Sequence, residues 1–185
     1  IRSAVRNDKN AKSKVYDFIF ASRLIEGKGL DLLLDALELC DTDGHNFTVA
    51  ICGNGPLAFK VTSLKLNNIK LIYLGYVKDM KDVLLASKVA LSLQKYENYP
   101  SQFLLEALAA NCDIVSTDVG DTRLLLNENI ATLIASDALS LKNSMISDDY
   151  DRSLERKLVV DRVLEQHSVK TFANYIEALI TETRR

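Results

Sequence analysis

Short apolar runs alternate with amphipathic stretches along most of this 185-residue chain, and this alternation constrains its fold more than any other feature. The apolar runs predict strands at residues 16–22, 47–52, 69–74, 89–93, 113–117 and 130–134. Helical patterns lie between them at 29–40, 57–67, 80–87, 101–110 and 122–127, and follow the last strand at 138–147, 150–166 and 169–184. Alternation at this spacing favours a parallel sheet with helices on both faces.

The predicted fold class is therefore α/β, a doubly wound, Rossmann-like parallel sheet of about six strands followed by C-terminal helices. The commonest order of such sheets is 3-2-1-4-5-6, and ligands bind where the order reverses, between strands 1 and 4. The loop after the first strand carries Arg23 and Lys28, and the loop after the fourth carries Glu97. We expect these two loops to meet at the carboxyl edge of the sheet.

Charge divides the chain into three expected parts. Residues 1–14 hold five cations and a single acid, and we interpret them as a basic linker from an N-terminal domain absent from this chain. A phosphate-binding tail is the alternative. Residues 15–149 are expected to form the sheet domain, and residues 150–185 to form helices packed on it. The first residue is Ile1 rather than Met, which also indicates an excised fragment.

The overall composition argues against several functions. Basic and acidic residues nearly cancel, 23 against 25, which gives no support to general nucleic-acid binding or to a membrane-surface role. No apolar run approaches the roughly 20 residues that span a bilayer, and no signal peptide is present. Cys40, Cys52 and Cys112 lie in or beside apolar segments, which is typical of core residues in a reduced, cytoplasmic protein.

Glu106 is the most conspicuous candidate site residue, because its helical stretch is otherwise almost wholly apolar. An unpaired carboxylate buried in such a face costs several kcal/mol. We therefore expect Glu106 to face a cleft and to bind a polar ligand. Glu97 is a second candidate, since it follows the end of a predicted strand.

Lys28 is predicted at a helix N-terminus, where the macrodipole disfavours a cation by a few tenths of a kcal/mol. An anionic ligand would reverse that preference, and Arg23 would add a forked donor to the same anion. Two exposed cations on a surface loop remain the alternative. Gly53 and Gly55 close the second strand and would let the backbone approach a phosphate, but taken alone they are better explained by an ordinary tight turn. Pro56 suits the first position of the next helix.

Other catalytic patterns are missing from the sequence. The glycines do not form a Walker motif, since no Lys-Ser/Thr follows them, and they do not form the dinucleotide fingerprint. His45 and His167 stand in polar turns without a matched partner. No metal-ligand spacing occurs, so no metal site is predicted.

Five segments in order resemble the C-terminal, donor-binding domain of retaining glycosyltransferases of family 4 (group 1), which have the GT-B fold. They are 22–29 (SRLIEGKG), 52–56 (CGNGP), 74–77 (LGYV), 97–109 (ENYPSQFLLEALA) and 117–121 (TDVGD). The resemblance covers roughly residues 16–135. His167-Ser168-Val169 is similar to the closing segment of that family.

The resemblance implies a role for each candidate. Arg23 and Lys28 would hold the diphosphate of a nucleotide sugar, Glu106 would bind its ribose, and Glu97 would lie beside the transferred sugar. The implied backbone contacts are made by Gly53, Gly55, Tyr76, Val77, Asn98, Tyr99, Pro100 and Ser101, with Tyr76 and Val77 near the base. Similar enzymes need no bound metal or other cofactor, use UDP-, GDP- or ADP-sugars, and retain the anomeric configuration.

Three positions depart from the family pattern. The two acids are usually eight residues apart, but Glu97 and Glu106 are nine apart. Pro100-Ser101 replaces a common glycine. Asn111 stands where a glycine usually ends the helix, and asparagine tolerates the left-handed conformation of such a cap.

The expected function is the donor half of a glycosyltransferase that moves a sugar to a glycan or lipid-linked acceptor, as in polysaccharide biosynthesis. The acceptor-binding domain is not in this chain, so we expect the chain alone to be inactive, and any peripheral membrane contact to be made by that domain. Two alternatives stay open. One is a non-catalytic nucleotide-binding or interaction module, and the other is a sugar-nucleotide epimerase of the same fold.

Overall fold

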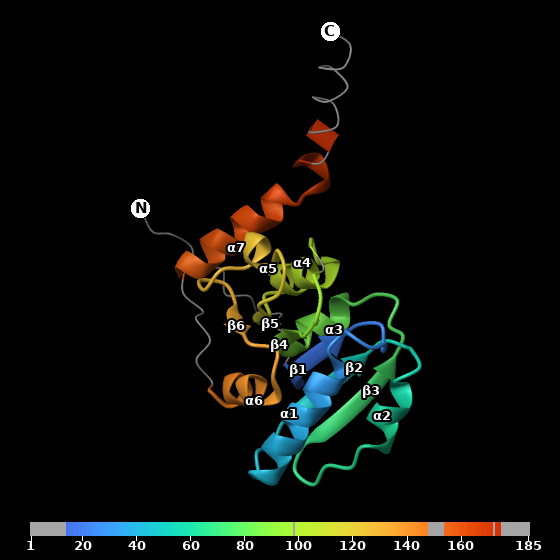
Figure 1. The fold of residues 1–185 in the computed structure, drawn as a ribbon. Helices are drawn as coiled ribbons and strands as arrows, with labels where there is room; N and C mark the ends of the chain where they lie inside the picture. Colours follow the sequence, from blue (N-terminus) through green and yellow to red (C-terminus); the bar gives the residue numbers. More distant parts are fainter. Residues whose placement is uncertain (1–13, 98, 148–153, 172, 175–185) are drawn as a thin grey trace.

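The computed structural model describes residues 14–97, 99–147, 154–171 and 173–174. Its strands form one parallel sheet with the order β3-β2-β1-β4-β5-β6 (Figure 1), which confirms the predicted fold class and strand order. The strands are β1 (Tyr16–Ala21), β2 (Thr48–Cys52), β3 (Lys70–Gly75), β4 (Ser87–Ser92), β5 (Asp113–Thr117) and β6 (Thr132–Ile134). The helices are α1 (Leu30–Thr42), α2 (Ala58–Ser63), α3 (Lys81–Leu85), α4 (Gln102–Ala109), α5 (Thr122–Leu125), α6 (Ala138–Ile146) and α7 (Leu154–Gln166).

Neighbouring residues of the central strands point to opposite faces of the sheet, because side chains alternate along a strand. Phe18 and Phe20 of β1 belong to an apolar cluster with α1, α2 and α6. Ile19, between them, belongs to a second cluster with α3, α4, α5 and α7. Both faces of β1 are therefore covered, which explains its continuous apolar run.

Helix α7 packs against α4 on the second face (Figure 1). Val160 is buried there, and Val163 and Leu164 lie against the same cluster. Residues 169–171 are also helical. In the part of the chain that the model describes, no helix is both long and apolar enough to cross a membrane.

The predicted helix 57–67 is wrong at both ends. It begins at Ala58, and Pro56 lies in the turn before it rather than in its first turn. It ends at Ser63 because the following residues serve another contact: the carboxylate of Asp41 accepts backbone hydrogen bonds from Asn67, Asn68 and Ile69 at 2.6–3.2 Å. A carboxylate that binds three successive backbone groups competes with the helix for those donors.

Three further differences from the predicted boundaries have identifiable causes. The helix predicted at 80–87 ends at Leu85, because Ser87 already pairs with Tyr16 in the sheet. The helix predicted at 122–127 ends at Leu125, since Leu126 is fully buried in an extended conformation. The last strand begins only at Thr132, after a turn in which Ile130 and Ala131 donate to the carbonyl of Asn127.

Candidate functional site

The loops after β1 and β4 meet at the carboxyl edge of the sheet, as the strand order predicted. The backbone N–H of Lys95 donates to the carbonyl of Gly27 at 2.9 Å. The ammonium of Lys28 donates to Oε1 of Gln94, also at 2.9 Å. One backbone and one side-chain hydrogen bond thus join the two loops at the point where the strand order reverses.

Arg23 and Lys28 open onto a cleft of about 470 Å³ at this point. They form part of one wall, and Pro100, Ser101 and Gln102 form part of the other. Arg23 is exposed and Lys28 is half-buried. The two candidate cations therefore reach a common space together with Pro100 and Ser101, which the family resemblance implies to contact the donor.

Gly29 sets the position of Lys28. Its φ of +89° is left-handed, and a Cβ atom there would lie only 2.0 Å from the carbonyl oxygen of Leu93. Only glycine lets α1 begin this close to the end of β4. No side chain caps α1, so its first N–H groups lack a side-chain acceptor, and the positive end of its dipole adds to the charge of Lys28.

Glu106 is half-buried and lines a neighbouring groove of about 930 Å³, as expected for a carboxylate that faces a cleft. The opposite side of the groove includes Lys78 and Lys81. Gln102, one helical turn before Glu106, lines the groove and the first cleft alike and donates to Oε1 of Glu106 at 2.8 Å. Gln102 therefore lies where the cleft and the groove adjoin. It donates a hydrogen bond to one of the two carboxylate oxygens of Glu106, the residue expected to bind the ribose.

Glu97 is exposed and lies against the loop after β5. Its Cβ and Cγ atoms are 2.6 and 2.7 Å from the position that a Cβ atom on Gly120 would occupy. The preceding Tyr96 packs in the same way on Gly27 of the loop after β1. Asn98 lies outside the described residues.

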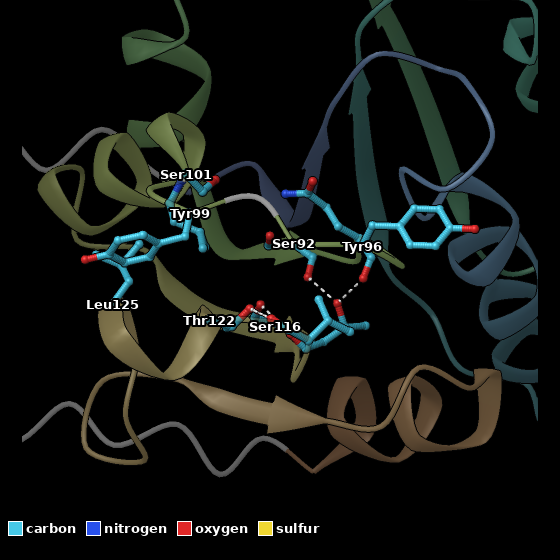
Figure 2. Close-up of a pocket in the computed structure, with 11 residues that line it drawn as sticks. Ser92, Tyr96, Tyr99, Ser101, Ser116, Thr122 and Leu125 are labelled. Carbon is cyan, nitrogen blue, oxygen red and sulfur yellow. Dashed lines mark hydrogen bonds between the residues drawn. The ribbon is translucent and has the colours of Figure 1, made fainter.

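A small cavity of about 20 Å³, lined by both polar and apolar side chains, lies behind this loop, between the ends of β4 and β5 (Figure 2). Thr117 donates through Oγ1 to the carbonyl of Gln94 at 2.6 Å, and so ties the residue that binds Lys28 to β5. The rings of Tyr96 and Tyr99 point in opposite directions from it in Figure 2. A cavity of this size has room for about one water molecule.

Gly53 and Gly55 lie where two loops are in contact. Cβ atoms on them would be 1.8 Å from the carbonyl oxygen of Ser22 and 2.3 Å from that of Leu24. Leu24 also donates its N–H to Asn54 and accepts from Leu57. These contacts give both glycines a structural role at the edge of the sheet, while their approach to a ligand stays a prediction.

Tyr76 and Val77 follow β3 and directly precede the residues that line the Glu106 groove. The Tyr76 side chain is exposed, and Val77 packs on the second apolar cluster. Cys52 ends β2 beside Gly53, and burial raises the pKa of its thiol to about 11. A thiol with that pKa is not a nucleophile at neutral pH.

His167 is a neighbour of the site that the sequence did not reveal. Its ring lies edge-on to Tyr99 with 6.0 Å between centroids, so the end of α7 reaches the loop that carries Glu97. No spacing rule connects residues this far apart in sequence. Among the residues that the model describes, no group of three or more His, Cys, Asp or Glu residues is arranged to hold a metal ion.

Known proteins share this architecture. The family model described as glycosyl transferases group 1 matches residues 2–147. Sucrose-phosphate synthase from Thermosynechococcus elongatus is similar in structure, with a TM-score of 0.74 and 17% identity over 93% of this chain and 46% of that one. Anabaena Alr3699/HepE, solved in complex with UDP-glucose, has a TM-score of 0.72 and 19% identity over 91% of this chain and 49% of that one.

A third similar structure is the catalytic domain of cholesterol-alpha-glucosyltransferase from Helicobacter pylori. It has a TM-score of 0.57 and 18% identity over 82% of this chain and 97% of that one. The chain spans less than half the length of the synthase and of HepE. At these identities the likeness establishes the fold alone. No curated protein sequence matches the chain.

Proposed function

Because this chain belongs to the group 1 glycosyl transferases, we propose that it is the donor-binding half of an enzyme that moves a sugar from a nucleotide diphosphate sugar to a glycan or lipid-linked acceptor. The observation that carries this proposal is the convergence of Arg23 and Lys28 on one cleft, with Glu106 in the adjoining groove. A diphosphate needs fixed cations, and a ribose needs an acceptor for its hydroxyls. The adjoining spaces offer both at the switch point of the sheet.

The proposed role of Arg23 and Lys28 is to stabilise the negative charge of the leaving group. When the bond between the sugar and the diphosphate breaks, negative charge builds up on the departing phosphate, and cations held in place stabilise that charge. Lys28 is held by Gln94, and Arg23 provides a planar fork that suits phosphate oxygens. The start of α1 directly after Lys28 has no side-chain cap, and the positive end of its dipole favours an anion near that residue.

The finer features of the proposal come from the family resemblance. We propose retention of the anomeric configuration, no requirement for a metal ion, and UDP, GDP or ADP as the carrier. Related structures include one solved in complex with UDP-glucose, which supports a nucleotide sugar as the ligand class. We further propose a reducing compartment, because all three cysteines are buried as core residues of the two apolar clusters.

We propose that catalysis needs an acceptor-binding domain beyond this chain, since an open half-cleft does not exclude water from the donor. The chain alone then binds the nucleotide weakly, with a Kd on the order of 0.1 to 1 mM, and transfers no sugar.

Ligand-observed NMR with UDP, GDP and ADP tests the proposal directly. We expect one nucleotide to bind selectively, and we expect Arg23→Ala/Lys28→Ala and Glu106→Ala to abolish that binding. Lys70→Ala is the matched control, because Lys70 is an exposed cation at the start of β3, at the opposite edge of the sheet. Failure of a folded sample to bind any of the three, or equal loss in the control, would favour the non-catalytic module.

A further inference from the structure

We infer that Gly120 is a positioning residue for Glu97, and that its lack of a side chain sets where the Glu97 carboxylate lies in the donor site. The inference rests on the proposed function, in which Glu97 lies beside the transferred sugar. It starts from a contact between the loops after β4 and β5, which are separated along the chain by α4 and β5.

The contact leaves no room for a side chain at position 120. A Cβ atom there would lie 2.6 Å from Cβ of Glu97, 2.7 Å from Cγ and 3.2 Å from Cα. Real carbon atoms do not approach this closely, so one of the two loops would have to move. The first two atoms belong to the stem of the Glu97 side chain, and displacing that stem displaces its carboxylate.

Backbone conformation alone does not require glycine here. Gly120 has a φ of +51°, and Asn111 in the same chain adopts a φ of +55°. Asparagine is among the residues that enter this region most readily. The need for glycine at position 120 therefore comes from Glu97 and not from the turn.

Hydrogen bonds hold the loop that carries Gly120 at both ends. Asp118 accepts an ion-paired hydrogen bond from Arg123 at 2.8 Å, and its backbone N–H donates to Ile134 at 2.9 Å. Thr122 closes the other end through a 2.6 Å hydrogen bond from its hydroxyl to the carbonyl of Val119. A larger residue at position 120 would consequently move Glu97.

Glu97 also has fixed neighbours in its own loop. The Tyr96 ring packs on Gly27, and the Tyr99 ring lies against His167. The loop is thus held on both sides of Glu97, and Gly120 supports the acid itself. The loop is thereby in contact with the loop after β1 through Tyr96 and with the end of α7 through Tyr99.

The test compares affinity for a nucleotide with affinity for its sugar. Kd values would be measured for UDP, GDP and ADP, and for UDP-glucose, GDP-mannose and ADP-glucose. We expect Gly120→Asn to weaken binding of the sugar nucleotide by about threefold or more, while the parent nucleotide keeps its Kd. Gly44→Asn is the matched control, because Gly44 has a φ of +79° and no atom within 4 Å of an added Cβ.

A double-mutant cycle with Glu97→Gly isolates the contact. Glu97→Gly removes the Cβ and Cγ atoms of Glu97. In that background, Gly120→Asn should change the ratio of the two Kd values less than it does in the native chain. It should also lower the free energy of unfolding less. The stability cycle needs no ligand. If no nucleotide binds the native chain, the proposed function fails, and the stability cycle still decides whether Gly120 supports Glu97.

Two results would overturn the inference. One is a Gly120→Asn variant that binds the sugar nucleotide as the native chain does. The other is a stability loss on Gly120→Asn that is equally large with and without the Glu97 side chain, since it would mean that the contact does not lie between these two residues.

Discussion

The ammonium of Lys28 donates a hydrogen bond to the side-chain oxygen of Gln94 at 2.9 Å, and this contact joins the loops after β1 and β4. Its acceptor is a neutral amide, so the bond orients the ammonium without cancelling its charge. A cation held by a neutral group keeps its full electrostatic attraction for a phosphate. The pair therefore combines fixed geometry with available charge.

Replacing Lys28 with Met should weaken diphosphate binding by about tenfold, which corresponds to about 1.4 kcal/mol. The variant keeps most of the aliphatic stem and removes the charge. Gln94→Leu should cause a smaller loss, because the ammonium remains but is no longer oriented. NMR titration with the preferred nucleotide checks both values, and equal affinity of Lys28→Met and the native chain would contradict the assignment. Binding to the native chain should also weaken at higher ionic strength.

Glu106→Gln should weaken the binding of a ribonucleotide by about tenfold and leave the binding of its 2′,3′-dideoxy analogue unchanged. Only the ribonucleotide offers the 2′ and 3′ hydroxyls to the carboxylate. Gln102→Leu should reproduce part of this effect, since Gln102 holds one oxygen of Glu106 at 2.8 Å. The double variant should lose less than the sum of the two single losses. Equal weakening of the dideoxy analogue would show that Glu106 acts on another part of the ligand.

Gly53→Ala should destabilise the fold by more than about 3 kcal/mol or prevent folding, because the new methyl group would collide with the carbonyl of Ser22. Gly44→Ala also places a side chain at a positive φ (+79°, against +124° at Gly53) but in open space, and it should cost only about 1 kcal/mol. Urea unfolding monitored by circular dichroism measures both. Similar losses at the two positions would show that backbone strain, not the contact, accounts for the effect.

Asp41 should make stability depend on pH in the acidic range. Backbone hydrogen bonds from Asn67 and Asn68 lower the pKa of its carboxyl below the ordinary value of 3.8. A carboxyl whose folded pKa lies below its unfolded pKa stabilises the fold fully above the unfolded value, and this contribution is lost as the pH falls through the folded value. Asp41→Asn should therefore be less stable than the native chain at neutral pH.

The difference between Asp41→Asn and the native chain should shrink as the pH is lowered to about 3. Urea midpoints across this range provide the measurement. Asp35→Asn is the control, because Asp35 is an exposed acid on the same helix. A constant difference at every pH would mean that Asp41 acts through its shape and not through its charge.

The strand order was predictable because each strand could be recognised by its apolar run and because parallel sheets follow few connection rules. That order brought Arg23 and Lys28 to the loop that carries Glu97. Glu106 was recognisable as an acid within an apolar helix. These inferences needed only local pattern and topology.

Contacts between distant loops were not predictable in the same way. Gln94 contacts Lys28, and Gly120 contacts Glu97, only because the fold brings distant parts of the chain together. No sequence periodicity links the members of either pair. Gln102 is an exception, since residues four apart on a helix face each other, so its contact with Glu106 was open to inference. Helix ends were missed for the same reason as the loops: α2 stops at Ser63 because distant Asp41 takes the next backbone donors.

Helix α4 lies between the sheet and α7, with Glu106 and Gln102 on the side that faces the groove and Val160 of α7 buried in the cluster that includes Leu108. We therefore expect a nucleotide bound in the groove to slow amide hydrogen exchange in residues 157–166 of α7, although these residues are not among those that line the groove. Unchanged exchange on nucleotide binding would show that α4 does not couple the two sides.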